Sequence, residues 1–265
     1  FNISRATFYD EATVGLSMLY LRFSLFLNGK NDLSLNQLGQ IYEILEDYEK
    51  AIKAFEKVSP SSPLYTDSVI EISENLNRLE KKVQARRKLR LLLYRKSENV
   101  KPVFVLGNLL RHQEKYKAAS KAYTRALKMV EPHQVQHWRL FYYRGISYER
   151  TKQWNRAEKD FLKALKLQPD QADVLNYLGY SWIEQKKNLK KAMDMIRKAN
   201  KFKPNDGYII DSLGWAHFKL GNFEKAVQHL ERAVSFKPED PIINDHLGDA
   251  YWEAGRRLEA GFQWN

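Results

Sequence analysis

Few side chains in this sequence have the types and spacing that catalysis or metal binding requires. His133 and His137 are four residues apart, a spacing that can place two imidazoles on one face of a helix, but Pro132 interrupts the segment beside them. Gly29-Lys30 lacks the upstream glycine of a phosphate-binding loop. Serine, histidine and aspartate occur without the glycine pattern of a nucleophile elbow. The sequence therefore predicts a protein that is not an enzyme and that holds no metal and no cofactor.

The densest positive charge in the chain lies between Lys81 and Lys96. This segment contains eight Lys or Arg residues and no acid, and apolar residues such as Val83 and Leu91 are interleaved with them, so it reads as a basic amphipathic helix. The basic residues are Lys81, Lys82, Arg86, Arg87, Lys88, Arg90, Arg95 and Lys96. The helix could be a solvated face in a repeat, or it could contact an acidic protein, an anionic membrane surface or nucleic acid. The formal net charge of the 265-residue chain is +12.

Small residues recur at an interval of about 34 residues, and this interval predicts the helices that position the basic segment and the rest of the chain. The recurring residues are Gly145, Gly179, Gly214 and Gly248, followed by Pro169, Pro204 and Pro238. A unit of this length fits one helix-turn-helix, which cannot bury its apolar face alone, so neighbouring units must stack into a solenoid. Each proline ends a second helix, and Asp170, Asp206 and Asp240 are suited to cap the next one.

A second set of residues defines the seam between the two helices of each unit. An alanine follows each glycine by 12 or 13 residues, and a large apolar residue follows four residues later. The alanines are Ala157, Ala192, Ala226 and Ala260, and the large residues are Phe161, Ile196, Leu230 and Trp264. Small side chains at matched sites let two helices approach closely. We also assign Tyr148, Trp182 and Tyr251 to these seams.

The register extends over the whole chain and predicts one all-α solenoid covering residues 1–265. Residues 138–171, 172–206 and 207–240 are full repeats, and 241–265 is a truncated one. Residues 32–65 and 100–137 are weaker copies, the latter lengthened around Pro132. Residues 66–99 form a degenerate repeat with Ser73 in place of the glycine, and 1–31 form a partial repeat with a helix expected from Val14 to Leu27.

The recurring Leu-Gly pairs, aromatic residues, Ala, Phe, Ala and Pro resemble the tetratricopeptide repeat family, most strongly from Trp138 onward. The resemblance implies a right-handed superhelical solenoid that binds other proteins. The stretch from Leu175 to Trp252 is similar to bacterial envelope repeat proteins, some of them lipoproteins that act as adaptors for a periplasmic protease. This implies a bacterial protein of the periplasm or envelope, with the cytoplasm as the alternative, and a protease as one possible partner.

The resemblance also implies which residues face a partner, because the first helix of each repeat lines the concave side in this family. The predicted groove residues are Arg139, Tyr142, Tyr143, Asp173, Asn176, Tyr177, Tyr180, Tyr208, Asp211, Trp215, Phe218, Asp245 and Trp252. Aromatic rings with amide and carboxylate groups between them suit an extended or helical protein segment. Tyr143, Tyr177 and Trp215 could instead pack across adjacent first helices.

We therefore expect an adaptor or scaffold protein that holds a partner peptide or helix in this groove. The alternatives are an assembly or membrane-surface factor acting through the basic 81–96 helix, and a non-catalytic arm of a larger enzyme. Nucleic acid is an unlikely partner because the groove aspartates would repel phosphates. No segment is long and apolar enough to span a membrane. The sequence begins without methionine, so we expect its N-terminus to be cut. Because it stops partway through a repeat, we also expect more chain beyond Asn265, and oligomers could form through exposed ends of the array.

Overall fold

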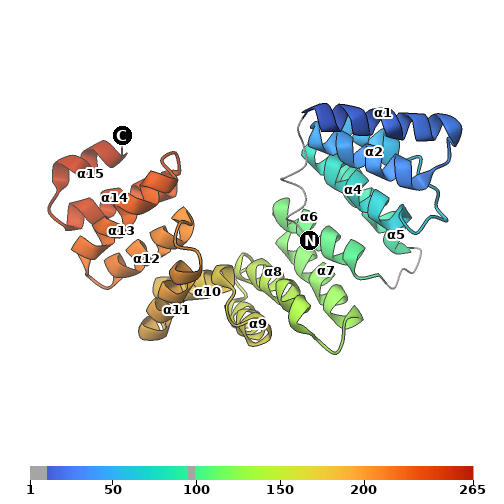
Figure 1. Cartoon of the computed structure of the whole chain (residues 1–265). Coiled ribbons are helices and arrows are strands. Elements are labelled where there is room, and N and C mark those ends of the chain that lie inside the picture. Colours follow the sequence, from blue (N-terminus) through green and yellow to red (C-terminus); the bar gives the residue numbers. More distant parts are fainter. Residues whose placement is uncertain (1–10, 95–98, 265) are drawn as a thin grey trace. The chain divides into compact units, whose positions relative to one another are not determined.

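The computed structural model describes residues 11–94 and 99–264 (Figure 1). These residues form fifteen α-helices and one short 3-10 helix, and none of them lies in a β-strand. The prediction of an all-α protein is confirmed. The partial N-terminal repeat contributes one helix, α1 (Glu11–Leu27), which includes the segment expected to be helical.

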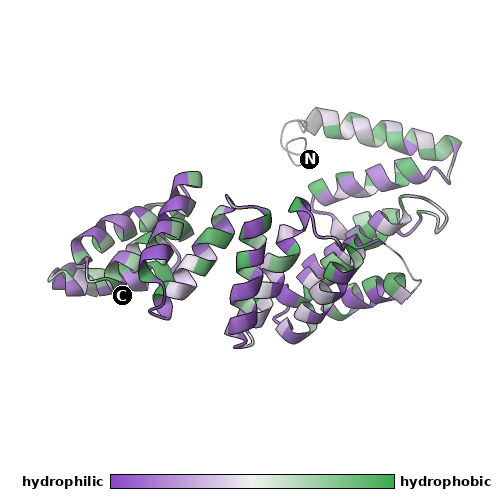
Figure 2. Cartoon of the chain, turned by 90° about the horizontal axis from the view of Figure 1, so that it is seen from below, coloured by the Kyte–Doolittle hydropathy of each residue, from purple (hydrophilic) through white to green (hydrophobic). Residues whose placement is uncertain are grey.

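The helices that follow α1 form helix-turn-helix pairs, and the two members of a pair pack against each other. Their bounds are α2 (Asp32–Ile44), α3 (Tyr48–Phe55), α4 (Tyr65–Arg78), α5 (Lys82–Tyr94), α6 (Lys101–His112), α7 (Tyr116–Met129), the 3-10 helix (Val135–His137), α8 (Trp138–Glu149), α9 (Trp154–Leu167), α10 (Ala172–Glu184), α11 (Leu189–Phe202), α12 (Gly207–Lys219), α13 (Phe223–Phe236), α14 (Pro241–Glu253) and α15 (Arg257–Trp264). Each helix carries both hydrophobic and hydrophilic residues, as Figure 2 shows, because one face packs against neighbours and the other meets solvent.

The chain divides into two compact units. The first contains Phe1–His133 and Ile146–Lys152, and the second contains Gln134–Gly145 and Gln153–Asn265. The division passes through α8. A single solenoid over the whole chain stays a prediction.

In six of the seven pairs the seam is a contact between a glycine of the first helix and a large side chain of the second. The contacts are Gly39 with Phe55, Gly107 with Tyr123, Gly145 with Phe161, Gly179 with Ile196, Gly214 with Leu230, and Gly248 with Trp264. A Cβ atom on Gly214 would lie 2.6 Å from Leu230 Cγ, closer than atoms can approach. The predicted seams of the last four pairs are confirmed, and Ala157, Ala192, Ala226 and Ala260 are completely buried.

The degenerate repeat forms a pair of the same kind, α4 with α5, although it lacks the glycine. Ser73 is completely buried, and its hydroxyl donates a hydrogen bond to the Val69 carbonyl at 2.8 Å. This bond satisfies the only polar atom that serine adds. Ala85 and Leu89 are also completely buried, so the pair still has a closed interior.

The turn within each pair has a residue in the left-handed backbone region shortly after the first helix. These residues are Glu46, Glu80, Glu114, Lys152, Lys186, Gly221 and Gly255, with φ between 53° and 81°, and the turn between α10 and α11 has a second one, Asn188, at 47°. The next backbone N–H donates to a carbonyl five residues earlier, as in the bonds from Lys81 to Leu76 and from Lys115 to Leu110. This is the bond that closes a Schellman motif at a helix end. Only two of the seven residues are glycine, which is why the sequence did not reveal this turn.

Two of the three predicted helix caps are confirmed. Asp206 accepts hydrogen bonds from the backbone of Tyr208 and Ile209, and Asp240 does the same for Ile242 and Ile243. The prediction for Asp170 is wrong. Gln171 occupies the cap position of α10, and Asp170 instead pairs with Lys198 at 2.8 Å.

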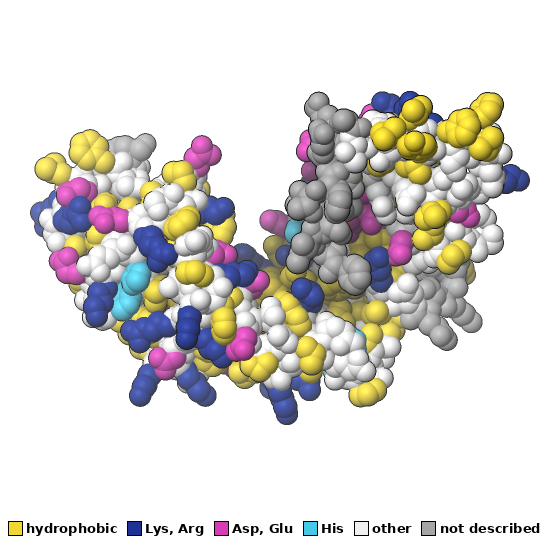
Figure 3. All heavy atoms as spheres, in the orientation of Figure 1, with side chains coloured by type: hydrophobic (Ala, Val, Ile, Leu, Met, Phe, Trp, Pro, Cys, Tyr) yellow, Lys and Arg dark blue, Asp and Glu magenta, His cyan; other side chains and the backbone are white. Residues whose placement is uncertain are grey.

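The first and last helices expose large apolar side chains. On α1, Phe26 is 85% and Leu27 is 70% exposed, and on α15, Phe262 is 82% exposed. Figure 3 shows hydrophobic side chains gathered over the α1 end of the first unit. These faces have the apolar composition of the surfaces that pack against neighbouring helices elsewhere in the chain.

Candidate protein-binding surface

The predicted groove residues all lie on the first helices of the second unit: on α10, α12 and α14, and on the part of α8 from Trp138 to Gly145. Their spacing of three or four residues keeps them on one side of each helix. The structure separates them into rings that pack together, polar groups that bridge repeats, and side chains that remain exposed.

The tyrosines of α8 and α10 form an aromatic cluster with Phe161 of α9. The ring centroids of Tyr142 and Tyr177 are 6.1 Å apart in an edge-to-face arrangement, and Tyr177 lies 5.2 Å from Phe161. Tyr143 lies 5.2 Å from Tyr142. These three tyrosines are half-buried, so part of each ring surface already packs within the unit.

Trp215 is at the centre of a second aromatic cluster, which joins α12 to α14. It stacks on His246 with a centroid separation of 3.9 Å and on Phe218 at 4.7 Å. Its indole N–H donates to Glu184 at 2.7 Å, and only 7% of the residue is exposed. In this arrangement Trp215 holds neighbouring repeats together and offers little surface to a partner.

A buried polar pair lies beside this cluster. His246 Nδ1 is 2.9 Å from Asp211 Oδ1, and each residue is 7% exposed. Burial raises the pKa of the Asp211 carboxyl, and the hydrogen bond from His246 acts in the opposite direction. The pair connects two first helices inside the unit, so Asp211 is occupied by an internal contact.

Two predicted groove residues of α10 also make polar contacts within the unit. Asn176 donates a hydrogen bond to the Ser212 hydroxyl at 3.1 Å, and Asp173 pairs with Lys203 at 2.5 Å. Burial, followed by the nearby charges of Glu184 and Asp211, raises the pKa of Tyr180 to about 12. Tyr180 is therefore a neutral hydrogen-bonding group at physiological pH.

The remaining predicted groove residues are accessible, and most of them lie on α12 and α14. Tyr208 is 53% exposed and Trp252 is 46% exposed, and Arg139 and Asp245 are exposed as well. On α14, Asp245 and Trp252 lie in line with Ile242 and Asp249, one helical turn apart from one to the next. We call these four residues the α14 stripe.

The α14 stripe combines negative charge with apolar surface. No Lys or Arg pairs with Asp245 or Asp249 among the described residues. Burial, and then the charge of Asp245, raises the pKa of Asp249. The two aspartates also line a pocket of about 500 Å³, together with Glu239, Asn244, Gln263 and Trp264. A positively charged group placed here would relieve the repulsion between the carboxylates.

Comparison with known proteins agrees with the helical pairs. Family models of the tetratricopeptide repeat match residues 34–59, 104–154 and 138–171, and a TPR repeat model matches residues 214–255. Together these matches cover about half of the chain and fall in both units. The chain belongs to the tetratricopeptide repeat (TPR) family.

Two curated relatives are each 26% identical to this chain over the matched residues. One is the TPR repeat-containing protein PA4667 of Pseudomonas aeruginosa, matched over 69% of this chain and 30% of that protein. The other is the BBSome complex member BBS4 of Bos taurus, matched over 70% of this chain and 35% of that protein. The chain therefore spans about a third of the length of the curated relatives it matches.

Solved structures with the same fold are more distant in sequence. The Cut9-Hcn1 hetero-tetramer of the APC/C has a TM-score of 0.69 at 15% identity, over 91% of this chain and 46% of that chain. A TPR protein from Parabacteroides merdae has a TM-score of 0.61 at 20% identity, over 74% of this chain and 76% of that chain. These similarities show the TPR fold.

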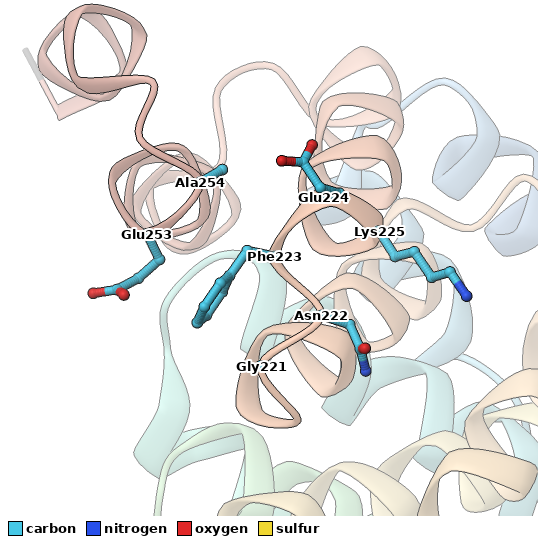
Figure 4. A pocket seen from close by; sticks show the side chains of 7 residues that line it. All are labelled: Gly221, Asn222, Phe223, Glu224, Lys225, Glu253 and Ala254. Atoms are coloured by element: carbon cyan, nitrogen blue, oxygen red, sulfur yellow. The ribbon is translucent and has the colours of Figure 1, made fainter.

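Another pocket of this TPR chain, about 360 Å³, lies beside the turn between α12 and α13. In Figure 4, the side chains of Asn222 and Lys225 point away from Phe223. The pocket therefore lacks the converging polar groups that small-molecule sites use. Within the described residues, no three His, Asp or Glu side chains are grouped as metal ligands, and His137 Nδ1 accepts a hydrogen bond from the Gln134 backbone.

Residues 82–94 of the basic segment form α5, and several charges of the segment are partnered. Lys81, Lys82 and Lys88 pair with glutamates at 3.3, 2.5 and 2.7 Å, and Arg86 donates to Gln113. Arg87 and Arg90 are exposed. Arg95 and Lys96 lie outside the described residues.

Among the helices that the structure describes, none is long and apolar enough to cross a bilayer.

Proposed function

We propose that this TPR chain is a non-catalytic adaptor that binds a protein segment along the first helices of its second unit. The observation that carries the proposal is the α14 stripe, where exposed apolar side chains flank two unpaired aspartates. Aromatic and apolar anchors supply most of the binding energy in protein interfaces, and charges around them select the partner.

The chemistry of the stripe defines the partner segment. Lysine or arginine side chains suit Asp245 and Asp249, and an apolar side chain suits the surface of Trp252 and Ile242. An extended or helical segment with this composition fits a line of residues spaced along one helix. We propose that Tyr208 on α12 extends the contact to the next repeat.

The biological setting is a further part of the proposal. The bacterial relative PA4667 supports a bacterial origin, and the resemblance of the segment from Leu175 to Trp252 to envelope repeat proteins supports an envelope complex. A protease is one class of partner that this resemblance favours. The adaptor function itself does not depend on that choice.

Selection from a random peptide library against the full chain tests the proposal. We expect enrichment of peptides that contain Lys or Arg next to an apolar residue. Their affinity, measured by fluorescence anisotropy, should fall about thirtyfold for Trp252→Ala, the loss typical of an interface anchor. Asp245→Lys should weaken binding as well.

Phe202→Ala is the matched control, because Phe202 on α11 is 45% exposed and lies off the stripe. This variant should bind selected peptides as the parent does. Peptides without basic residues, or equal binding by the Trp252→Ala and Phe202→Ala variants, would contradict the proposal.

A further inference from the structure

The outer side of α5 combines exposed apolar residues with arginines. Val83, Leu91 and Tyr94 are 70%, 58% and 89% exposed, and Arg87 and Arg90 are exposed beside them. At 3.6 residues per turn these five side chains fall within an arc of about 100°. The buried residues of α5 occupy the opposite side of the helix: Ala85, Leu89, Leu92 and Leu93.

The outer side of α7 is a line of positive charge. Lys117, Lys121, Arg125 and Lys128 are all exposed and fall within an arc of about 80°. The helix carries no Asp or Glu. Its opposite side contains Ala119, Tyr123 and Ala126, which are completely buried.

The two outer sides belong to neighbouring repeats of the first unit. Val83 and Lys117, Arg87 and Lys121, Leu91 and Arg125, and Tyr94 and Lys128 are each 34 residues apart, which is the repeat interval. Both helices pack against α6 (Figure 1). Because α5 and α7 are equivalent second helices with the same side buried, their outer sides face the same direction. We call these nine residues the basic face.

The cations of the basic face lack counter-charges. Across the part of the chain that the structure describes, no carboxylate pairs with Arg87, Arg90 or any of the four cations on α7. Other basic residues of this unit do have such partners, for example Lys88 with Glu56 at 2.7 Å and Lys101 with Asp67 at 2.6 Å. Six unpaired positive charges on one surface therefore remain available to an anionic partner.

We infer that the basic face docks onto a membrane surface that contains anionic lipids. Interfacial helices insert apolar side chains at the boundary of the acyl chains while Lys and Arg contact lipid head groups. Val83, Leu91 and Tyr94 supply the apolar side chains, and the six cations supply the head-group contacts. Nucleic acid is a poorer match, because single strands need aromatic platforms and the face offers one tyrosine among aliphatic residues.

Vesicle co-sedimentation of the full chain tests this inference. The chain should bind phosphatidylcholine vesicles that contain roughly one third phosphatidylglycerol, should not bind pure phosphatidylcholine, and should be released by salt. Each cation is worth about fivefold in affinity, so Lys117→Glu/Lys121→Glu should weaken binding by about 25-fold or more. Leu91→Ser/Tyr94→Ser should weaken it by about tenfold through lost insertion.

Lys190→Glu/Lys201→Glu is the matched control, because it makes the same change in net charge on α11 of the second unit. It should leave vesicle binding close to that of the parent, and circular dichroism should show that all variants are folded. Equal loss in the control, no effect of Leu91→Ser/Tyr94→Ser, or tighter binding to polyglutamate or to a mixed-sequence oligonucleotide than to the vesicles would overturn the inference. None of these outcomes bears on peptide binding at the α14 stripe.

Discussion

Replacing Gly214 by alanine tests the glycine seam that six of the described helix pairs share. The new Cβ would lie 2.6 Å from Leu230 Cγ, 3.0 Å from Leu230 Cδ2 and 3.2 Å from the Ala226 carbonyl oxygen. Leu230 and Ala226 are completely buried, so neither can move away without displacing α13. Overpacking of this kind costs about 1–3 kcal/mol.

Alanine is also the better helix former, by about 1 kcal/mol. We therefore expect Gly214→Ala to lower the free energy of unfolding by up to about 2 kcal/mol in total. Gly15 in α1 is the control, because a Cβ there meets no atom within 4 Å. Gly15→Ala should raise the free energy of unfolding by about 0.5–1 kcal/mol.

Urea denaturation followed by circular dichroism measures both effects, and hydrogen exchange of the α12 and α13 amides localises the loss. In a Leu230→Ala background the Gly214→Ala change should cost at least 1 kcal/mol less, roughly the coupling expected for touching residues. If Gly214→Ala proved as favourable as Gly15→Ala, the seam would not be the tight contact that sets the spacing of these helices.

Three further predictions concern polar and degenerate sites. Burial lowers the pKa of His217 from 6.5 to about 4, so between these two pH values the unfolded chain binds a proton that the native chain does not. The free energy of unfolding should therefore fall as the pH is lowered through this window, by roughly 1–2 kcal/mol after allowance for screening. Denaturation at several pH values should show a smaller fall in His217→Phe. His246→Ala removes the hydrogen-bond partner of Asp211 and the ring stacked on Trp215, and should lower the free energy of unfolding by about 3 kcal/mol. Intrinsic tryptophan fluorescence reports the changed environment of Trp215. A loss below about 1 kcal/mol would show that the pair contributes little to stability. Ser73→Gly gives the degenerate repeat the family glycine, but it should lower the free energy of unfolding by about 1–2 kcal/mol because α4 and α5 are packed around the serine. A variant more stable than the parent in urea denaturation would show that α4 and α5 approach each other as closely as the other pairs do.

The seam could be predicted from the sequence because it depends on residue size at a fixed interval. A glycine in one helix requires a large residue in its partner, and Gly179 with Ile196 satisfies this rule as Gly145 does with Phe161. The burial of Trp215 could not be predicted in the same way. It depends on His246, which belongs to the next repeat and has no periodic equivalent that marks it as a stacking partner.

The same limitation applies to charges. Asp170 directly follows Pro169, whereas Asp206 and Asp240 stand two residues after their prolines, so Gln171 is the residue at the cap position of α10. That Lys198 holds the Asp170 carboxylate instead depends on where α11 lies. The charge of the 81–96 segment was evident from composition. Lys88 is paired with Glu56, whereas Arg87 and Arg90 remain free of carboxylates. This difference depends on which side of α5 each residue occupies and on where the glutamates of neighbouring helices lie.

The left-handed turns offer equivalent sites, one in each repeat, at which the cooperativity of unfolding between repeats can be measured. Five of the seven carry Glu or Lys where glycine would remove about 1–2 kcal/mol of backbone strain, an advantage reduced by the greater freedom of glycine in the denatured chain. The same exchange can be made at one turn after another, a repeat apart each time. If the repeats melt together, every exchange should move one common transition by a similar increment; if they melt separately, each should protect only the amides of its own hairpin.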